Sequence, residues 1–237
     1  MTKPFRFKQF TISQEGCAMK VNTDGVLLGA YADASHAERV LDIGTGTGVV
    51  ALMLAQRFPD LDIDALEPDQ SASSTATLNF AQSPWQDRLM IYNATFQDYF
   101  KGKSRLAYDL IVSNPPFFID ALQSESAQKS LARHTDITFF HQLLSEAARH
   151  LSPHGKLQVI VPVELAMRLL VLAPGEELFL NQLMNIRSFE KSEPFRQLLT
   201  FSREETSHQH LDLYIYEAEK VYSDQYKQLL RDFLTIF

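Results

Sequence analysis

A glycine-rich loop between an apolar strand and a helix most constrains the fold of this chain. Arg39–Ile43 has the pattern of a short buried strand, and Val49–Arg57 has the apolar spacing of a helix. The segment Asp42-Ile43-Gly44-Thr45-Gly46-Thr47-Gly48 joins them. Glycines let the backbone turn tightly and approach a ligand closely, and the start of the helix adds positive potential. The sequence therefore predicts a ligand site where this strand meets the helix.

Strand-like and helix-like segments alternate after this loop, which predicts a parallel sheet with helices on both faces. The expected strands are Leu61–Glu67, Leu89–Tyr92, Tyr108–Ser113 and Lys156–Val161, and the expected helices are Asp69–Gln82 and Thr138–His150. The β-rich runs Glu177–Arg187, Phe195–Ser202 and Leu211–Glu217 predict antiparallel strands at one edge, before a last helix in Ser223–Phe237. We therefore expect an α/β fold with a mostly parallel, seven-stranded sheet.

Length and composition suit one domain, residues 1–237, with residues 1–36 as an N-terminal extension over the ligand and residues 37–237 as the catalytic core. The only cysteine is Cys17, so no internal disulfide can form, as suits a reducing cytoplasm. We see no signal-peptide pattern and no apolar run near the roughly 18–20 residues of a membrane helix. The seven histidines lack metal-ligand spacing. We expect a cytoplasmic protein without a metal or a membrane segment.

The expected second strand ends in Glu67, whose carboxylate can accept hydrogen bonds from both hydroxyl groups of a ribose. The loop alone also fits a dinucleotide pattern, since Gly46–Ala51 reads G-x-G-x-x-A. The chain has no second domain for a hydride-transfer substrate, and this favours S-adenosyl-L-methionine over a dinucleotide. The candidate cofactor contacts are Asp42, Gly44, Gly46, Gly48 and Glu67.

Asn114-Pro115-Pro116-Phe117 directly follows an expected buried strand, and packing alone does not explain this sequence. Proline stiffens the loop and has no N–H, so the carbonyl groups can face a ligand. Asn114 offers an amide donor and acceptor, and Phe117 offers a flat face. Hydrogen bonds from an exocyclic NH2 group to the Asn114 side-chain oxygen and the Pro115 carbonyl would aim the nitrogen lone pair at a methyl donor. Asn114, Pro115 and Phe117 are therefore the candidate catalytic residues, and Asn114 also faces the expected cofactor.

These motifs resemble a known family. Asn-Pro-Pro-Phe matches the [Asn/Asp/Ser]-Pro-Pro-[Tyr/Phe/Trp] signature of amino-group methyltransferases, and the glycine loop resembles that of class I methyltransferases. Further stretches resemble the bacterial tRNA adenine-N6 methyltransferases: Phe7–Phe10, Cys17–Val21, Thr23–Gly25, Leu27–Ala30, Ala51–Arg57 and Gln82–Trp85. The resemblance covers roughly residues 5–165.

The resemblance implies a Rossmann-like class I methyltransferase fold and methyl transfer from S-adenosyl-L-methionine to N6 of adenosine 37, in the anticodon loop of valine tRNA. It also implies cofactor contacts from Lys20, Thr23 and Asp24. Many relatives hold the cofactor adenine with an aspartate after the third strand. Thr95 occupies that position here, so backbone groups, Thr95 or Asp98 are the candidates for this role.

Two other functions stay open on the sequence alone. A protein glutamine N5-methyltransferase would use the same loop on a side-chain amide. The resemblance in residues 5–30 and the lack of a long N-terminal helical domain argue against it. A catalytically idle RNA-binding or scaffold protein could keep the same fold, but Asn114, Pro115 and Glu67 are all intact.

The net charge of −7 argues against nonspecific nucleic-acid binding, although residues 174–237, with 11 acids and 7 bases, carry −4 of it. The aromatic residues that alternate with Arg6 and Lys8 are more typical of a core than of RNA contact, and a solvated surface loop is the more common explanation of the other basic groups. The candidates for RNA contact are Arg6, Lys8, Lys101, Lys103, Arg105, Arg133 and His134. The sequence does not give the oligomeric state, and a monomer is our expectation.

Overall fold

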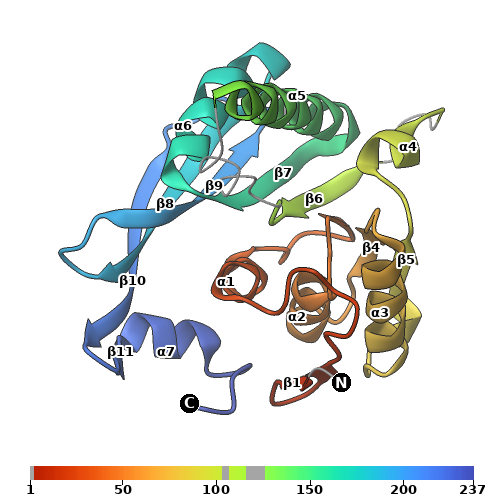
Figure 1. Cartoon of the computed structure of the whole chain (residues 1–237), viewed down its shortest axis with the longest axis vertical. Coiled ribbons are helices and arrows are strands. Elements are labelled where there is room, and N and C mark those ends of the chain that lie inside the picture. Colours follow the sequence, from red (N-terminus) through yellow and green to blue (C-terminus); the bar gives the residue numbers. More distant parts are fainter. Residues whose placement is uncertain (1–2, 103–106, 116–125) are drawn as a thin grey trace.

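The computed structural model describes residues 3–102, 107–115 and 126–237, without the side chains of residues 126–136 (Figure 1). A nine-stranded sheet forms its centre, in the order β11-β10-β8-β9-β7-β6-β3-β4-β5. Five neighbouring strands are parallel: β3 (Arg39–Ile43), β4 (Asp62–Leu66), β5 (Leu89–Tyr92), β6 (Tyr108–Ser113) and β7 (Leu151–Val161).

The order of the parallel strands reverses at β3, which pairs with β4 on one side and with β6 on the other. At such a reversal the loops that follow the strands diverge and open a crevice outside the carboxyl ends of the strands. The glycine loop follows β3, Glu67 follows β4 and Asn114 follows β6. The topology therefore brings the three strongest sequence motifs to the carboxyl end of the sheet.

The C-terminal strands extend the sheet beyond the predicted seven. They are β8 (Phe179–Phe189), β9 (Pro194–Ser202), β10 (Gln209–Ala218) and β11 (Val221–Tyr222). β9 is antiparallel to both β7 and β8, which confirms the predicted antiparallel edge. The sequence predicted seven strands, whereas the sheet has nine. The prediction that Leu211–Glu217 is an antiparallel strand was also wrong, since β10 runs parallel to β8. The chain crosses past β8 after β9, so β10 pairs with β8 in parallel, and β11 then folds back antiparallel to β10.

Helices cover both faces of the sheet (Figure 1). One face packs against α1 (Thr23–Tyr31), α2 (Val49–Arg57), α3 (Gln70–Ala81) and α7 (Asp224–Leu230). The other face packs against α4 (Phe96–Phe100), α5 (Ser126–His150) and α6 (Val163–Leu172). The chain also forms two short 3-10 helices, η1 (Gln86–Arg88) and η3 (Ala173–Glu176). Within the described ranges, none of the helices is long and apolar enough to cross a membrane.

Successive side chains of the central strands alternate between the two cores. In β3, Val40 packs on the side of α1 and α2, and Leu41 packs on the side of α4 and α5. In β6, Leu110 and Ile111 divide in the same way. Because both faces of these strands are buried, they are apolar runs rather than alternating ones.

Several predicted boundaries shifted in the structure, among them the starts of α5 and β7. α5 begins at Ser126 rather than at the predicted Thr138. The sequence did not predict the first turns of this helix because they are polar and show no apolar periodicity. β7 begins at Leu151, where the sequence predicts a turn. The Pro-His-Gly stretch lies inside β7 because the pairing with β6 changes register between Tyr108 and Leu110 and so accommodates the extra residues.

A small hairpin near the N-terminus lies apart from the main sheet. It pairs β1 (Phe5–Arg6) with β2 (Thr11–Ile12) in antiparallel orientation. Phe7 forms a bridge with Leu234, and the Lys8 amide donates to the Phe233 carbonyl. The first described residues are thereby fixed to the segment after α7.

Candidate active site

A cavity of about 400 Å³ opens at the carboxyl end of the sheet, in the crevice beside β3. This volume falls within the range of small-molecule and cofactor sites. Its lining comes mainly from the segments that follow β3, β4, β5 and β6 and from the chain before and at the start of α1. The lining residues are Cys17–Lys20, Asn22, Gly25, Asp42–Thr47, Val49, Val50, Leu66–Asp69, Ala72, Ala94–Gln97, Ser113–Pro115 and Phe139.

The glycine loop has the backbone conformation that only glycine adopts freely. Gly44, Gly46 and Gly48 have φ angles of 74°, 56° and 83°. A Cβ on Gly44 or Gly46 would meet no atom within 4 Å, so this backbone is open to a ligand. Gly48 has a different role, because a Cβ there would lie 2.5 Å from the Phe80 ring. The loop therefore combines an open ligand-facing backbone with a close contact to α3.

Glu67 is a buried carboxylate at the cavity wall. Its Oε2 accepts a hydrogen bond from the Gly46 amide at 2.9 Å, and its Oε1 accepts one from the Asp69 amide at 2.9 Å. These bonds fix the side chain and tie the glycine loop to the segment after β4. A carboxylate has about four lone-pair sites, so acceptor capacity for a ribose remains on both oxygens.

Asp42 lies at the base of the cavity with 1% of its surface exposed. Burial raises the pKa of this carboxyl to about 7, and the negative charge of Glu67 also raises it. A hydrogen bond from the Thr45 hydroxyl at 2.6 Å partly offsets these effects. Asp42 therefore changes its charge state near neutral pH.

Asn114 presents an unsatisfied acceptor to the site. Among the described residues its buried Oδ1 has no hydrogen-bond partner. Its Nδ2 lies beside α1, 3.6 Å from the position that a Cβ on Gly25 would take. Leaving a buried acceptor unpaired costs about 1–3 kcal/mol. A donor on a bound substrate would remove this cost, which is the chemistry expected of an amino group.

The segment before α1 contributes differently from the prediction. The N-cap of α1 is Asn22, whose Oδ1 accepts from the Gly25 amide at 2.9 Å. Lys20 lines the cavity, but Thr23 and Asp24 do not. Asp24 instead accepts a hydrogen bond from Arg196 Nε on β9.

Thr95 and Asp98, the candidates for adenine binding, form a cap on α4. Thr95 Oγ1 accepts from the Asp98 amide at 3.1 Å and donates to Asp98 Oδ2 at 2.8 Å. Thr95 lines the cavity together with Phe96 and Gln97, whereas Asp98 is exposed and outside the lining. The geometry therefore favours Thr95 and the backbone of this turn over the Asp98 carboxylate.

The structure does not gather the predicted RNA contacts beside Asn114. Lys8 Nζ donates to the Arg231 carbonyl, and Gln56 near the end of α2 donates to the Asp232 carbonyl. Lys8 therefore lies at the far end of α2 from the glycine loop, and Arg6 is exposed on the same hairpin. Arg133 and His134 belong to α5, with side chains outside the description; Lys103, Arg105 and Phe117 lie outside the described residues altogether.

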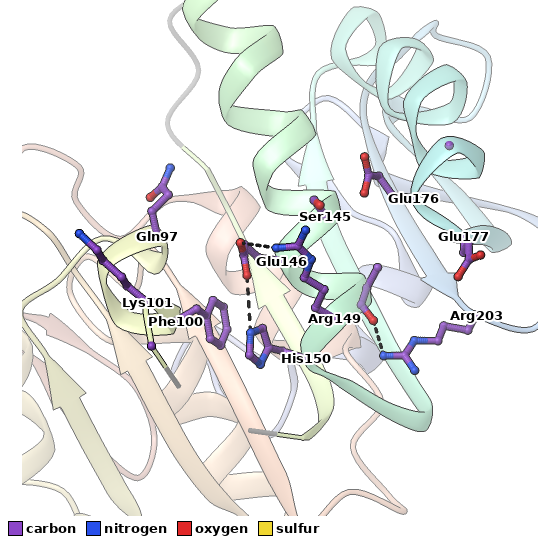
Figure 2. A pocket seen from close by; sticks show the side chains of 13 residues that line it. Gln97, Phe100, Lys101, Ser145, Glu146, Arg149, His150, Glu176, Glu177 and Arg203 are labelled. Atoms are coloured by element: carbon purple, nitrogen blue, oxygen red, sulfur yellow. Dashed lines mark hydrogen bonds and ion pairs between the residues drawn. The ribbon is translucent and has the colours of Figure 1, made fainter. Parts of the chain in front are cut away.

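Lys101 lines a second and larger cavity, of about 850 Å³, between the end of α4, the second half of α5 and η3 (Figure 2). Its lining residues are Gln97, Phe100–Gly102, Ser145, Glu146, Ala148–His150, Gly175–Glu177 and Arg203. Figure 2 shows Glu146 between Arg149 and His150, with a contact of 3.5 Å to each. The Phe100 and His150 rings stack at 3.9 Å. This cavity lies by the amino end of β7, away from Asn114.

Several cavity-lining residues were not predicted as site residues, among them Asn22, Gly25 and Phe139. Asn22 is a favoured N-cap type directly before Thr-Asp-Gly, so a signal for it was present. Phe139 gave no such signal. It reaches the cavity because α5 packs on α4, where the Phe139 and Phe96 rings meet edge to face at 5.4 Å.

Comparison with known proteins agrees with this geometry. The sequence profile of the methyltransferase small domain family matches residues 17–179. A tRNA1(Val) (adenine(37)-N6)-methyltransferase from Pedobacter heparinus is 45% identical over the full length of both chains. A protein of the same name from Bacteroides thetaiotaomicron is 42% identical over 98% of both chains. The crystal structure of a predicted O-methyltransferase from Agrobacterium tumefaciens, 16% identical, aligns with a TM-score of 0.67 over 89% of this chain and 96% of its own.

The sheet order, the glycine loop and the shared fold define a class I methyltransferase. The cofactor of this class is S-adenosyl-L-methionine. The chain belongs to the methyltransferase small domain family and, within it, groups with the tRNA1(Val) (adenine(37)-N6)-methyltransferases.

Proposed function

We propose that this chain transfers a methyl group from S-adenosyl-L-methionine to N6 of adenine 37 in valine tRNA. The observation that carries the proposal is the buried Oδ1 of Asn114, which has no hydrogen-bond partner in the described ranges and lies beside a cavity of cofactor size. The full-length relatives named for this reaction support the choice of adenine in tRNA over a protein amide.

The cavity residues fit the cofactor. The open backbone of Gly44 and Gly46 accommodates a ligand at close range, and Glu67 is placed to accept hydrogen bonds from the ribose hydroxyls. We assign the adenine to the turn at Thr95 and the amino-acid end to the side of Lys20 and Asp42. When bound, S-adenosyl-L-methionine supplies an activated methyl group on a sulfonium sulfur.

Asn114 and Pro115 perform the remaining chemistry by orientation. The lone pair of adenine N6 is delocalised into the ring, which makes this nitrogen a poor nucleophile. Hydrogen bonds from N6–H to Asn114 Oδ1 and to the Pro115 carbonyl favour a tetrahedral nitrogen and direct its lone pair toward the methyl group. The N6 proton leaves after transfer, to water or to one of these oxygens. Phe117 is the proposed stacking partner of the adenine.

The target base has to leave its stack to reach Asn114. Unstacking a loop nucleotide costs on the order of a few kcal/mol, less than for a paired base. We propose that the anticodon loop binds at the carboxyl end of the sheet and that one copy of the chain is sufficient for the reaction. A tRNA substrate places the activity in the cytoplasm.

A transfer assay tests this function. Purified protein is incubated with methyl-labelled cofactor and valine tRNA from a strain that lacks the modification. We expect label at N6 of adenosine 37, and no label in a transcript with guanosine at that position. Label in a glutamine-containing protein substrate, with none in tRNA, would contradict the proposal. Absence of cofactor binding by calorimetry would instead indicate an idle protein with the same fold.

A further inference from the structure

An ion pair connects α1 with the antiparallel strand β9 at the carboxyl end of the sheet. Arg196 Nε lies 2.8 Å from Asp24 Oδ2, although the two residues are 172 positions apart in the chain. The side chain of Asp24 is 11% exposed and that of Arg196 is 27% exposed. The pair is therefore partly shielded from water and screened less than a surface pair.

The guanidinium of Arg196 is held in a fixed orientation. Its Nη1 donates to the Phe195 carbonyl at 3.0 Å, while Nε donates to Asp24. A planar fork with two fixed bonds loses little further freedom when it holds a carboxylate. Asp24 lies in the first turn of α1, where a negative charge also interacts favourably with the helix dipole.

The same turn of α1 lies close to the start of the catalytic loop. A Cβ on Gly25 would lie 3.6 Å from Asn114 Nδ2 and 3.2 Å from Val49 Cγ1, so no side chain larger than that of glycine fits between the turn and the Asn114 amide without close contact. The Asn22 side chain closes the turn by accepting from the Gly25 amide at 2.9 Å. The turn is thus joined to β9 through Asp24 and lies beside the Asn114 amide at Gly25.

The first turn of α1 bounds the space around the Asn114 amide on the side of Gly25. Asn114 Oδ1 has no hydrogen-bond partner among the described residues, so it contributes no bond there that would hold the side chain before substrate binds. The position of the nearby α1 turn therefore limits the space in which the amide can turn. A displacement of about 1 Å in a catalytic group can lower a rate by about a hundredfold.

We propose that Arg196 is a positioning residue for methyl transfer. Through Asp24 it holds the first turn of α1 against Asn114, so that Oδ1 stays directed at the substrate amino group. Arg196 needs no contact with substrate or cofactor for this role. The inference rests on the proposed function for its kinetic test.

The variants Arg196→Met and Asp24→Asn test the proposal. Each should lower kcat about tenfold at saturating cofactor and tRNA, because the amide loses part of its fixed orientation. The KM for tRNA and the Kd for S-adenosyl-L-methionine should change less than about threefold, a split that general damage to the fold would not give. Arg187→Met is the matched control, since Arg187 Nε also lies 2.8 Å from a carboxylate, Asp212, on the neighbouring edge strands. Its kcat should match that of the wild type.

Coupling and partial rescue sharpen the test. The double variant Arg196→Met/Asp24→Asn should be no slower than the slower single variant, because both changes break one contact. Arg196→Lys keeps a positive charge and should recover part of the lost kcat. Additive losses in the double variant, or equal losses for Lys and Met, would overturn the proposal. A raised KM for tRNA at unchanged kcat would also overturn it and make Arg196 an RNA contact.

One measurement is independent of the substrate. In the cofactor-bound protein, amide hydrogen exchange in residues 22–26 should become faster in Arg196→Met and stay unchanged in Arg187→Met. Faster exchange in Arg196→Met would support the role of Arg196 in holding the α1 turn even if the wild type transferred no methyl group to tRNA. The lack of transfer would then contradict the proposed function alone. Unchanged exchange would contradict the positioning role itself.

Discussion

Two cavities of this molecule differ in what their polar groups do. The cavity beside Asn114 is the smaller of the two, about 400 Å³ against about 850 Å³, yet it contains a buried acceptor without a partner among the described residues. In the larger cavity Glu146 contacts both Arg149 and His150 (Figure 2). Arg203 donates to the carbonyl of Leu151 at 2.8 Å, at the end of α5.

This difference indicates that the smaller cavity is a ligand site, whereas the larger one is a space between α4, α5 and η3 whose polar groups already contact one another. Glu146 and its partners satisfy one another, so a ligand there would have to compete with contacts already made. Within the described part of the chain Asn114 Oδ1 has no partner, and the backbone of Gly44 and Gly46 is open to a ligand. Unmet bonding capacity beside an open backbone, rather than volume, is what favours the smaller cavity as the proposed active site.

The largest effect should come from Asn114→Ala. Removal of the acceptor should lower kcat about a thousandfold, because electrostatic groups aimed at the reacting atom contribute this much in comparable sites. Calorimetry should show a cofactor Kd within about threefold of the wild type. The control Asn114→Asp keeps an acceptor oxygen and should retain more activity than Ala. An equal loss of transfer and of cofactor binding would mean that the loop at Asn114 has a structural role. It would also contradict the distinction drawn between the two cavities.

The next effect should come from Glu67→Gln. One carboxylate oxygen becomes an NH2 group, which is a donor and cannot accept the hydrogen bond from the amide of Gly46 or Asp69. Loss of a charged acceptor costs about 1.5–3 kcal/mol, so the cofactor Kd should rise about a hundredfold by calorimetry. Glu176→Gln, in the larger cavity, is the matched control and should leave this Kd unchanged. A similar rise in both variants would remove the distinction between the cavities.

A third test uses the pKa of Asp42, which burial raises to about 7. The unfolded chain loses this proton near pH 4, so between about pH 4 and 7 only the folded chain keeps it. The stabilisation is complete below about pH 4 and is lost as the pH rises to about 7. The unfolding free energy of the wild type relative to Asp42→Asn should therefore fall by about 2–3 kcal/mol between about pH 5 and 7.5. Urea denaturation at several pH values measures it, and a constant difference would contradict the raised pKa.

The smallest effect should come from Arg149→Met in the larger cavity. Arg149 is exposed and its contact with Glu146 is 3.5 Å long, so its removal should change the free energy of unfolding by less than about 1 kcal/mol. Transfer to tRNA should stay within about twofold of the wild type. A rise in KM for tRNA would assign this surface to RNA binding and give the larger cavity a function.

The sequence predicted the parts of the molecule that depend on local pattern. β3, β5, β6 and α2 have the predicted bounds, because each is bounded by turn residues or by the glycine loop. The cavity lining includes Lys20, Asp42, Gly44, Gly46, Glu67, Thr95, Asn114 and Pro115 from the predicted set.

The features that depend on long-range packing could not be predicted in the same way. The pairing of Asp24 with Arg196 joins positions 172 residues apart, and neither neighbourhood carries a local signal for it. The parallel setting of β10 follows from where the chain crosses β8, which periodicity does not encode. Asp98 is a typical cofactor ligand by residue type, but the cap with Thr95 directs it to solvent.

The bridge between Phe7 and Leu234 also bears on how the chain is made. Lys8 and Arg231, which meet beside it, are 223 residues apart. A ribosome adds about 5–20 residues per second, so roughly 10–45 s pass between the synthesis of the hairpin and that of the segment it contacts. During synthesis the aromatic rings of Phe7 and Phe10, buried in the finished protein, are without part of their cover. The hairpin therefore gains its full cover only after the C-terminal segment has emerged.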